Sequence, residues 1–202
     1  MNSVYPSSLE SIIEFFKKFP GIGEKSAERM ALSILNIPLD EIQIASNALV
    51  KARETLHPCD VCGNLTDSLK CNICEDEARN KNLICVVEDY KSIYAFEKAG
   101  NFKGVYHVLN GLISPIDDIG VDDINLSSLI RRIKELENPE LILALKGTIE
   151  GETTILYIKK IFENKNVKIS RLSYGLPSGA EIDYLDMSTI EKALKDRKII
   201  SE

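Results

Sequence analysis

The chain has 202 residues, 44% of them hydrophobic, and a formal net charge of −6. This length and apolar content are enough for one medium-sized core and a smaller module. The negative charge argues against a protein that holds nucleic acid by bulk positive potential, so any DNA contact must come from a local patch or from backbone groups. No apolar stretch approaches the length of a membrane span, and the first thirty residues show no signal-peptide pattern. We therefore expect a protein of the reducing cytoplasm with no membrane partner.

The N-terminal segment has the apolar spacing of short amphipathic helices. Ser7 and Glu10 have the spacing of a capping box, which predicts the start of a first helix. The Pro-Gly-Ile-Gly run at residues 20–23 ends this helix, and a second is expected from about Glu24. Pro38 suits the first position of a third helix.

The Gly-Ile-Gly hairpin between the first two helices is a candidate phosphate-binding element. Gly21 and Gly23 are both expected to adopt backbone conformations that other residues resist, which would expose consecutive N–H groups at the start of the second helix. Such a group of donors suits a phosphate oxygen, and Lys25 and Arg29 would add positive charge. An ordinary helix–helix turn explains the same pattern, because a lone Gly-x-Gly is a weak signal.

Four cysteines lie within sixteen residues, in the order Cys59-x2-Cys62-x8-Cys71-x2-Cys74. Two Cys-x-x-Cys pairs separated by a short linker are typical of a tetrahedral metal site. Two disulfides are the alternative, but they need an oxidising compartment. We therefore predict one zinc ion per chain with a structural role, because four thiolates leave no open position for a substrate. Cys85 lies in an apolar run and is expected to be a buried hydrophobic residue.

After the cysteines, short apolar strands alternate with amphipathic helices. This alternation predicts a parallel sheet covered on both faces. We expect strands at 83–87, 104–109, 141–145 and 167–172, and helices at 92–99, 126–136 and 153–162. Ser188 is expected to cap a last short helix.

Three acidic residues follow strands of the predicted sheet. Glu88 ends the first strand, and Glu150 and Glu152 come after the third. Because the carboxyl ends of parallel strands face the ligand crevice, these carboxylates could meet there. The pattern resembles the Toprim module of topoisomerases, primases and some nucleases, in which such a cluster holds Mg²⁺ for phosphoryl transfer. Surface glutamates in the first turn of a helix are an equally ordinary explanation.

The chain as a whole resembles the RecR family of bacterial recombination mediators. Residues 19–31 are similar to the helix-hairpin-helix of that family. Further similar segments are Gly104–Gly111, Ile113–Pro115, Glu150–Thr153, Tyr174–Gly179 and Asp183–Asp186. One departure is Lys146-Gly147, which stands where the family usually has Asn-Pro.

The resemblance implies an α/β protein in four parts. They are a helix-hairpin-helix domain (1–57), a four-cysteine zinc finger (58–80), a Toprim-like parallel α/β domain (81–175) and a Walker-B-like C-terminal tail with strand and helix (176–202). It also implies a non-enzymatic, DNA-binding recombination mediator that forms tetrameric rings. Such a protein acts with RecO and RecF to help load RecA on single-stranded DNA.

Two other functions remain open at this point. One is a Mg²⁺-dependent Toprim nuclease or primase using Glu88, Glu150 and Glu152, which the absence of an identifiable nucleophile disfavours. The other is a zinc-stabilised interaction module without a nucleic-acid role, which the glycine hairpin disfavours.

Overall fold

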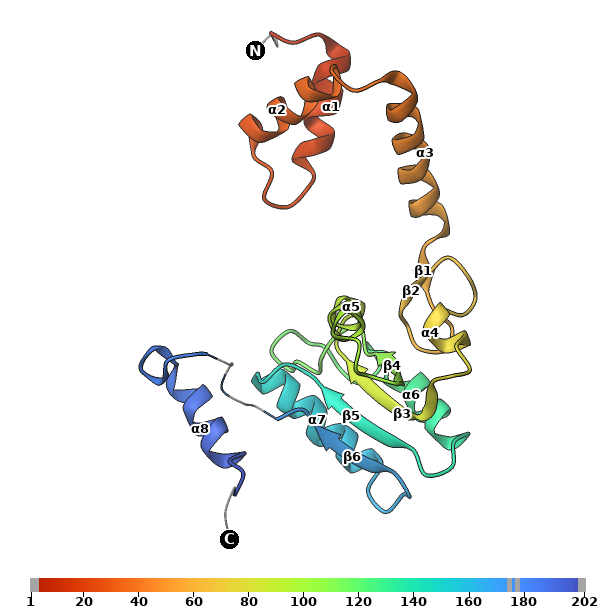
Figure 1. Ribbon diagram of the computed structural model, residues 1–202, viewed down its shortest axis with the longest axis vertical. Coiled ribbons are helices and arrows are strands. Elements are labelled where there is room, and N and C mark those ends of the chain that lie inside the picture. Colours follow the sequence, from red (N-terminus) through yellow and green to blue (C-terminus); the bar gives the residue numbers. More distant parts are fainter. Residues whose placement is uncertain (1–3, 174–175, 177–178, 200–202) are drawn as a thin grey trace. The chain divides into compact units, whose positions relative to one another are not determined.

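The computed structural model describes residues 4–173, 176 and 179–199. The chain divides into two compact units, Met1–Leu56 and His57–Glu202, and each is described by itself (Figure 1). Within the described ranges, no helix is both long and apolar enough to cross a lipid bilayer.

The first unit is built on two short helices that pack against each other, α1 (Ser7–Lys17) and α2 (Glu24–Ile34). Ala27 and Ala31 are fully buried against Leu9 and Ile13 of α1. Their small side chains let the two helix backbones approach closely, which fixes the short connection between them.

The predicted helices of this unit are confirmed, but two of their starting residues are wrong. Pro6, and not Ser7, is the N-cap of α1, and no side chain caps it. Pro38 is likewise the N-cap of α3 (Leu39–Thr55) and does not lie within its first turn. In both cases proline, whose ring fixes φ, is the last residue before the helix.

Helix α3 leaves an apolar surface open. No residue of α3 is buried. Several large apolar side chains on it are more than half exposed, namely Leu39, Ile44, Leu49 and Val50.

The second unit is built on a four-stranded, fully parallel sheet, as predicted. The strands are β3 (Asn80–Val87), β4 (Gly104–Val108), β5 (Glu140–Ala144) and β6 (Lys168–Arg171). Their order across the sheet is β4-β3-β5-β6. The helices packed on it are α5 (Tyr90–Ala99), α6 (Leu126–Lys134) and α7 (Ile149–Ile161).

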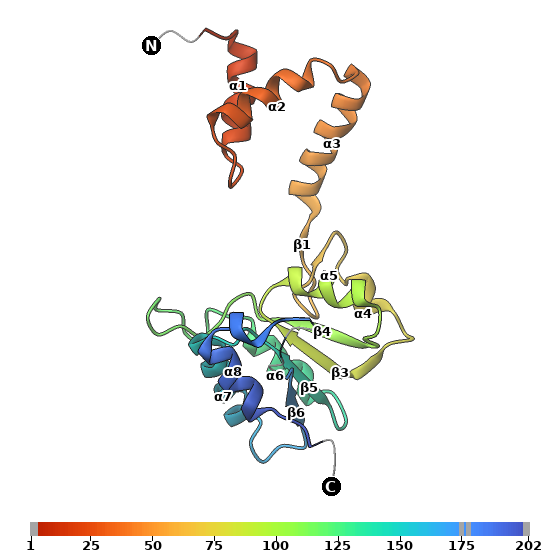
Figure 2. The same ribbon diagram turned by 60° about the vertical axis from the view of Figure 1, so that its left-hand side comes forward.

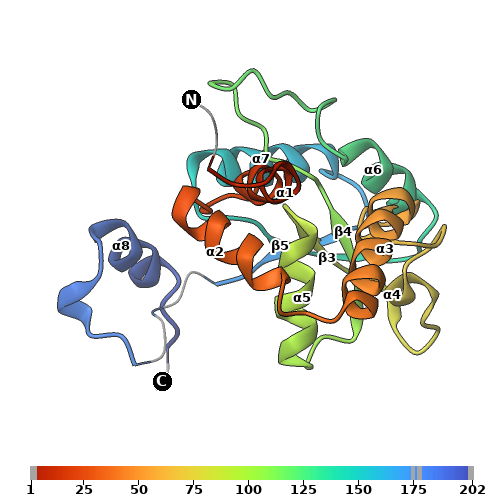
Figure 3. The same ribbon diagram turned by 90° about the horizontal axis from the view of Figure 1, so that it is seen from above.

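The helices cover opposite faces of this sheet (Figure 3). Cys85, Val87 and Tyr106 point to the α5 side, where they pack with Ile93. The alternate strand residues point to the other side and pack against α6 and α7. Strand β3 therefore leads into a helix on one face, and its neighbour β5 leads into a helix on the other.

A small module precedes the sheet. It consists of a two-residue antiparallel ladder between β1 (His57–Pro58) and β2 (Leu65–Thr66), followed by α4 (Asn72–Glu75). Figure 2 shows this module beside β4. The Val108 N–H donates a 2.7 Å hydrogen bond to the Cys62 carbonyl, which ties the module to the end of that strand.

The C-terminal segment contains a 3-10 turn, Ile182–Tyr184, and a last helix, α8 (Met187–Lys195). The expected cap of α8 is wrong by two residues. Asp186, and not Ser188, is the N-cap, and its carboxylate accepts a hydrogen bond from the Thr189 N–H at 3.0 Å. Of the segment 174–179, residues 174–175 and 177–178 lie outside the described residues.

Candidate functional site

The four cysteines of the small module form one compact cluster. The Sγ atoms of Cys59, Cys62, Cys71 and Cys74 all lie within 4.8 Å of one another. Tetrahedral zinc at about 2.3 Å from each sulfur would place the sulfurs about 3.8 Å apart. The donor set and the spacing therefore suit a zinc ion.

The cluster contains no disulfide. All four cysteines are free thiols, and the Cys62 and Cys71 sulfurs lie 3.6 Å apart. Backbone N–H groups already point at the sulfurs, since Asn64 N–H donates to Cys62 and Cys71 N–H to Cys59. Such donors stabilise thiolates, which are the form of cysteine that binds a metal.

The thiols of the cluster hydrogen-bond to one another, so the loss of a proton from one changes the pKa of its neighbours. Hydrogen bonds from the side chains of Cys62 and Cys74 hold the pKa of Cys71 well below its usual value. The fifth cysteine, Cys85, lies in β3, where burial raises the pKa of its thiol to about 12. It is an inert core residue, as the sequence predicts.

Both glycines of the hairpin between α1 and α2 were predicted to have unusual backbone conformations, and the prediction is confirmed for Gly21 alone. Gly21 has φ +80°, a conformation that L-residues rarely adopt, so glycine is required there. Gly23 has φ −88° and ψ 174°, which is ordinary extended backbone, so the prediction for this residue is wrong. A Cβ atom built on Gly23 would meet no atom within 4 Å, so the space beside the start of α2 is open to an approaching group.

The start of α2 offers free donors and positive charge. Among the described residues, no acceptor faces the backbone N–H groups of Gly23, Glu24 and Lys25. Lys25 and Arg29 are exposed, one turn apart on one side of α2, and neither has an ion-pair partner in the described ranges. Glu24 is held at 2.8 Å by Lys17. Backbone donors beside exposed cations are the kind of groups that suit a phosphate oxygen.

We use the name switch-point crevice for the place in the sheet where the carboxyl ends of β3 and β5 meet the first turn of α7. Adjacent strands whose following helices lie on opposite faces mark the place where open α/β sheets bind ligands. Glu88 follows β3 there, and its carboxylate accepts a hydrogen bond from the Lys146 ammonium at 2.9 Å. This ion pair was not anticipated from the sequence.

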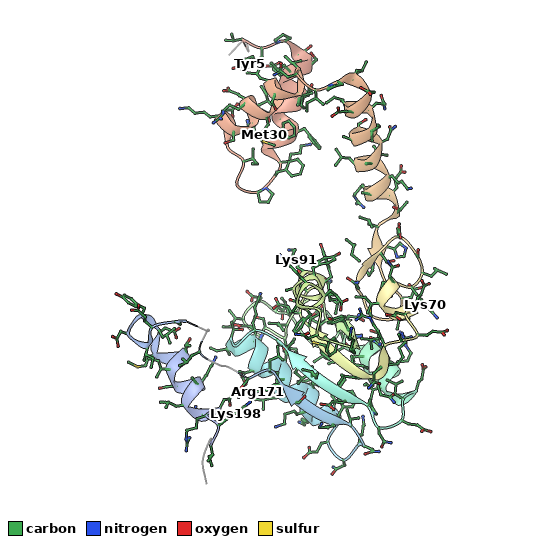
Figure 4. The ribbon with its side chains drawn as sticks, in the orientation of Figure 1. Tyr5, Met30, Lys70, Lys91, Arg171 and Lys198 are labelled. Atoms are coloured by element: carbon green, nitrogen blue, oxygen red, sulfur yellow. The ribbon has the colours of Figure 1, made fainter. Side chains whose placement is uncertain are left out.

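The other two acidic residues lie in the first turn of α7. A hydrogen bond from Thr148 lowers the pKa of the Glu150 carboxyl. Glu152 lies 3.4 Å from the Arg171 guanidinium, and Figure 4 places Arg171 at the end of β6. Each of the three predicted acids therefore has its own partner.

This arrangement does not fit a three-carboxylate Mg²⁺ site. In the part of the chain that the structure describes, the four cysteines are the one group of three or more side chains close enough to hold an ion. Glu88, Glu150 and Glu152 do not converge in this way.

Gly151 has a steric role in the crevice. A Cβ atom on Gly151 would lie 1.9 Å from the Lys146 carbonyl oxygen, which is backbone and cannot rotate away. The first turn of α7 therefore rests directly on the chain that leaves β5. This contact explains why glycine separates Glu150 and Glu152.

We expect Gly151→Ala to lower the free energy of unfolding by about 2 kcal/mol or more, because the clash outweighs the better helix propensity of alanine. Urea denaturation followed by far-UV circular dichroism measures the change. Gly120→Ala is the matched control, since its new Cβ would meet only Asp123 Oδ2, at 3.5 Å. Equal stability of the two variants would contradict the contact.

Comparison with known proteins gives three family matches along the chain. Residues 9–53 match the family model described as RecR, helix-hairpin-helix. Residues 82–173 match the Toprim domain, and residues 175–198 match RecR, C-terminal. Proteins named recombination protein RecR in two strains of Clostridium perfringens are 47% identical to the chain over 196 residues, which is 97% of this chain and 98% of theirs.

Proposed function

The chain belongs to the RecR family of recombination proteins, and on this premise we propose that it is a DNA-binding recombination mediator with no catalytic activity of its own. The observation that carries the proposal is the start of α2, where backbone N–H groups with no acceptor among the described residues lie beside Lys25 and Arg29. These groups recognise phosphate and carry no base information, so binding is independent of sequence.

The proposed partners follow from the family. Together with RecO and RecF, the protein helps RecA to load on single strands in the cytoplasm. A net charge of −6 suits this role, because a mediator that must release DNA to a recombinase benefits from several weak contacts rather than one strong one.

The cysteine cluster is proposed to hold one structural zinc ion per chain. Four sulfur donors complete a tetrahedral shell, so no position is left for water or substrate. The ion would fix the module that is hydrogen-bonded to the end of β4 through Val108 and Cys62.

A Toprim-type phosphoryl-transfer enzyme is the competing function. The ion pairs at Glu88 and Glu152 leave these carboxylates poorly placed to hold Mg²⁺. Purified protein incubated with Mg²⁺ or Mn²⁺ and labelled single- and double-stranded DNA should give a shifted complex and no cleavage, ligation or primer synthesis. A metal-dependent product that disappears in Glu88→Ala would favour the enzyme over the mediator as the function of this chain.

The active form is proposed to be a tetrameric ring joined through N- and C-terminal contacts. In support, α3 carries half-exposed Leu49 and Val50, and Met187 and Leu194 of α8 are 80% and 60% exposed. Exposed apolar surface of this kind marks interfaces. Light scattering at working concentration should give four times the 22.6 kDa chain mass. A strictly monomeric protein that still binds DNA tightly would contradict the ring.

A further inference from the structure

The switch-point crevice contains a charge pair in the position where a ligand or ion would enter. We infer that the Lys146 ammonium takes the place of a divalent cation in this crevice, so that the Toprim domain of this chain works without a metal ion. The inference concerns the crevice alone and does not depend on the DNA-binding proposal.

The topology fixes where the pair lies. Val87 of β3 is in register with Ala144 of β5, so Glu88 and Lys146 leave neighbouring strands at the same edge of the sheet. The chain turns to α5 after Glu88 and to α7, on the opposite face, after Lys146. The 2.9 Å ion pair therefore spans the opening between the two central strands.

Lys146 provides the positive charge that balances the Glu88 carboxylate. The Glu88 side chain is 23% exposed and the Lys146 side chain is 66% exposed, so the pair lies at the surface with the carboxylate as its more buried member. A hydrogen bond to the Glu88 carboxylate raises the pKa of Lys146 above its usual value, and the side chain is an ammonium at neutral pH in either case. A divalent ion at Glu88 would have to displace this cation or lie beside it.

The position of Lys146 is determined by its own backbone. The Lys146 carbonyl lies under the first turn of α7, where the absence of a side chain at Gly151 admits it. Lys192 of the C-terminal segment donates a hydrogen bond to the next carbonyl, that of Gly147. The loop is thus held from two directions beside Glu88.

A second cation, at the end of the edge strand β6, strengthens the inference. Arg171 lies 3.4 Å from Glu152 and 3.1 Å from Asp196. Glu152 is therefore also balanced by a protein cation. Removal of one lysine should expose Glu88 as a free carboxylate while this second pair stays in place.

The test is a Mn²⁺ titration of the full, zinc-loaded chain, followed by the electron paramagnetic resonance signal of free Mn²⁺. The wild-type protein should show no saturable site in the low millimolar range. Lys146→Met, which keeps the chain length and removes the charge, should bind Mn²⁺ at least about ten-fold more tightly, because an ion no longer meets a positive charge a few ångströms away. Adding Glu88→Gln to this variant should abolish the gain.

Two controls complete the design. Lys146→Arg keeps the positive charge and should behave as wild type. Lys98→Met removes an exposed lysine of α5 that has no ion pair among the described residues, and it should also leave Mn²⁺ binding unchanged. A wild-type Mn²⁺ site that Glu88→Gln removes would overturn the inference. So would a Lys146→Met protein that is folded by circular dichroism and gains no Mn²⁺.

Discussion

Cys71→Ser is expected to lose its zinc and to unfold the small module that the four cysteines organise. The Cys71 sulfur lies 3.6 Å from the Cys62 sulfur, and the Cys71 N–H donates a hydrogen bond to the Cys59 sulfur. With one ligand missing, the metal shell is incomplete, and for a structural site the binding free energy of the metal is folding free energy. We expect a loss of more than about 4 kcal/mol of stability in this module.

Elemental analysis of zinc per chain, combined with limited proteolysis of residues 57–80, measures this effect. The matched control is Cys85→Ser, which changes a buried cysteine in β3 that lies outside the cluster. Cys85→Ser should keep about one zinc ion per chain. Undiminished zinc in Cys71→Ser would remove Cys71 from the ligand set.

The double variant Lys25→Ala/Arg29→Ala is expected to bind DNA at least about ten-fold more weakly, and to do so equally for all sequences. Both side chains are exposed on one side of α2, next to N–H groups that lack an acceptor among the described residues. Contacts to phosphate release counterions, so their loss also lowers the slope of log K against log salt by about 0.7–0.9 for each contact. Fluorescence anisotropy at several salt concentrations measures both quantities.

A charge-matched control separates the hairpin from the general effect of charge. Lys51→Ala/Arg53→Ala removes the same two charges from exposed positions of α3. It should leave affinity and salt slope close to those of wild type. If the two double variants were equally impaired, the hairpin would have no special role in DNA binding.

The sequence predicts features that depend on local chemistry. The cysteine spacing specifies the cluster because each Cys-x-x-Cys pair is closed by its own turn, and the linker between the pairs is short. The alternation of apolar strands and helices predicts the parallel sheet because continuous apolar strands are typical of sheets covered on both faces. Strand β4 is buried throughout, whereas the edge strand β6 is not. The glycine hairpin was predictable because the Pro-Gly-Ile-Gly run is a local signal for a turn, although only Gly21 has the unusual φ.

The sequence was less informative about helix ends, where several residues can act as the cap. Ser188 and Asp186 are both good caps and lie two residues apart, and the structure uses the carboxylate of Asp186. Hydrogen bonds from Thr189 and Ser188 hold the pKa of this carboxyl well below its usual value. The local pattern alone does not rank two such neighbours.

The contacts of the crevice depend on tertiary structure. Glu88 and Lys146 are 58 residues apart, and their ion pair follows from the register of β3 with β5. The sequence placed Glu88 at the correct edge of the sheet and identified Lys146 as unusual. It did not show that the two side chains meet, because strand register was not known.

The loading of RecA on single-stranded DNA coated by single-strand-binding protein tests the central claim most directly. The claim is that this chain is a non-catalytic mediator that contacts DNA through the glycine hairpin and the start of α2. With RecO and RecF present, addition of the wild-type protein should accelerate RecA filament formation, followed by RecA ATP hydrolysis, and the DNA should remain intact. Lys25→Ala/Arg29→Ala should give much less acceleration. No acceleration by the wild-type protein, or cleavage of the DNA by it, would contradict the account.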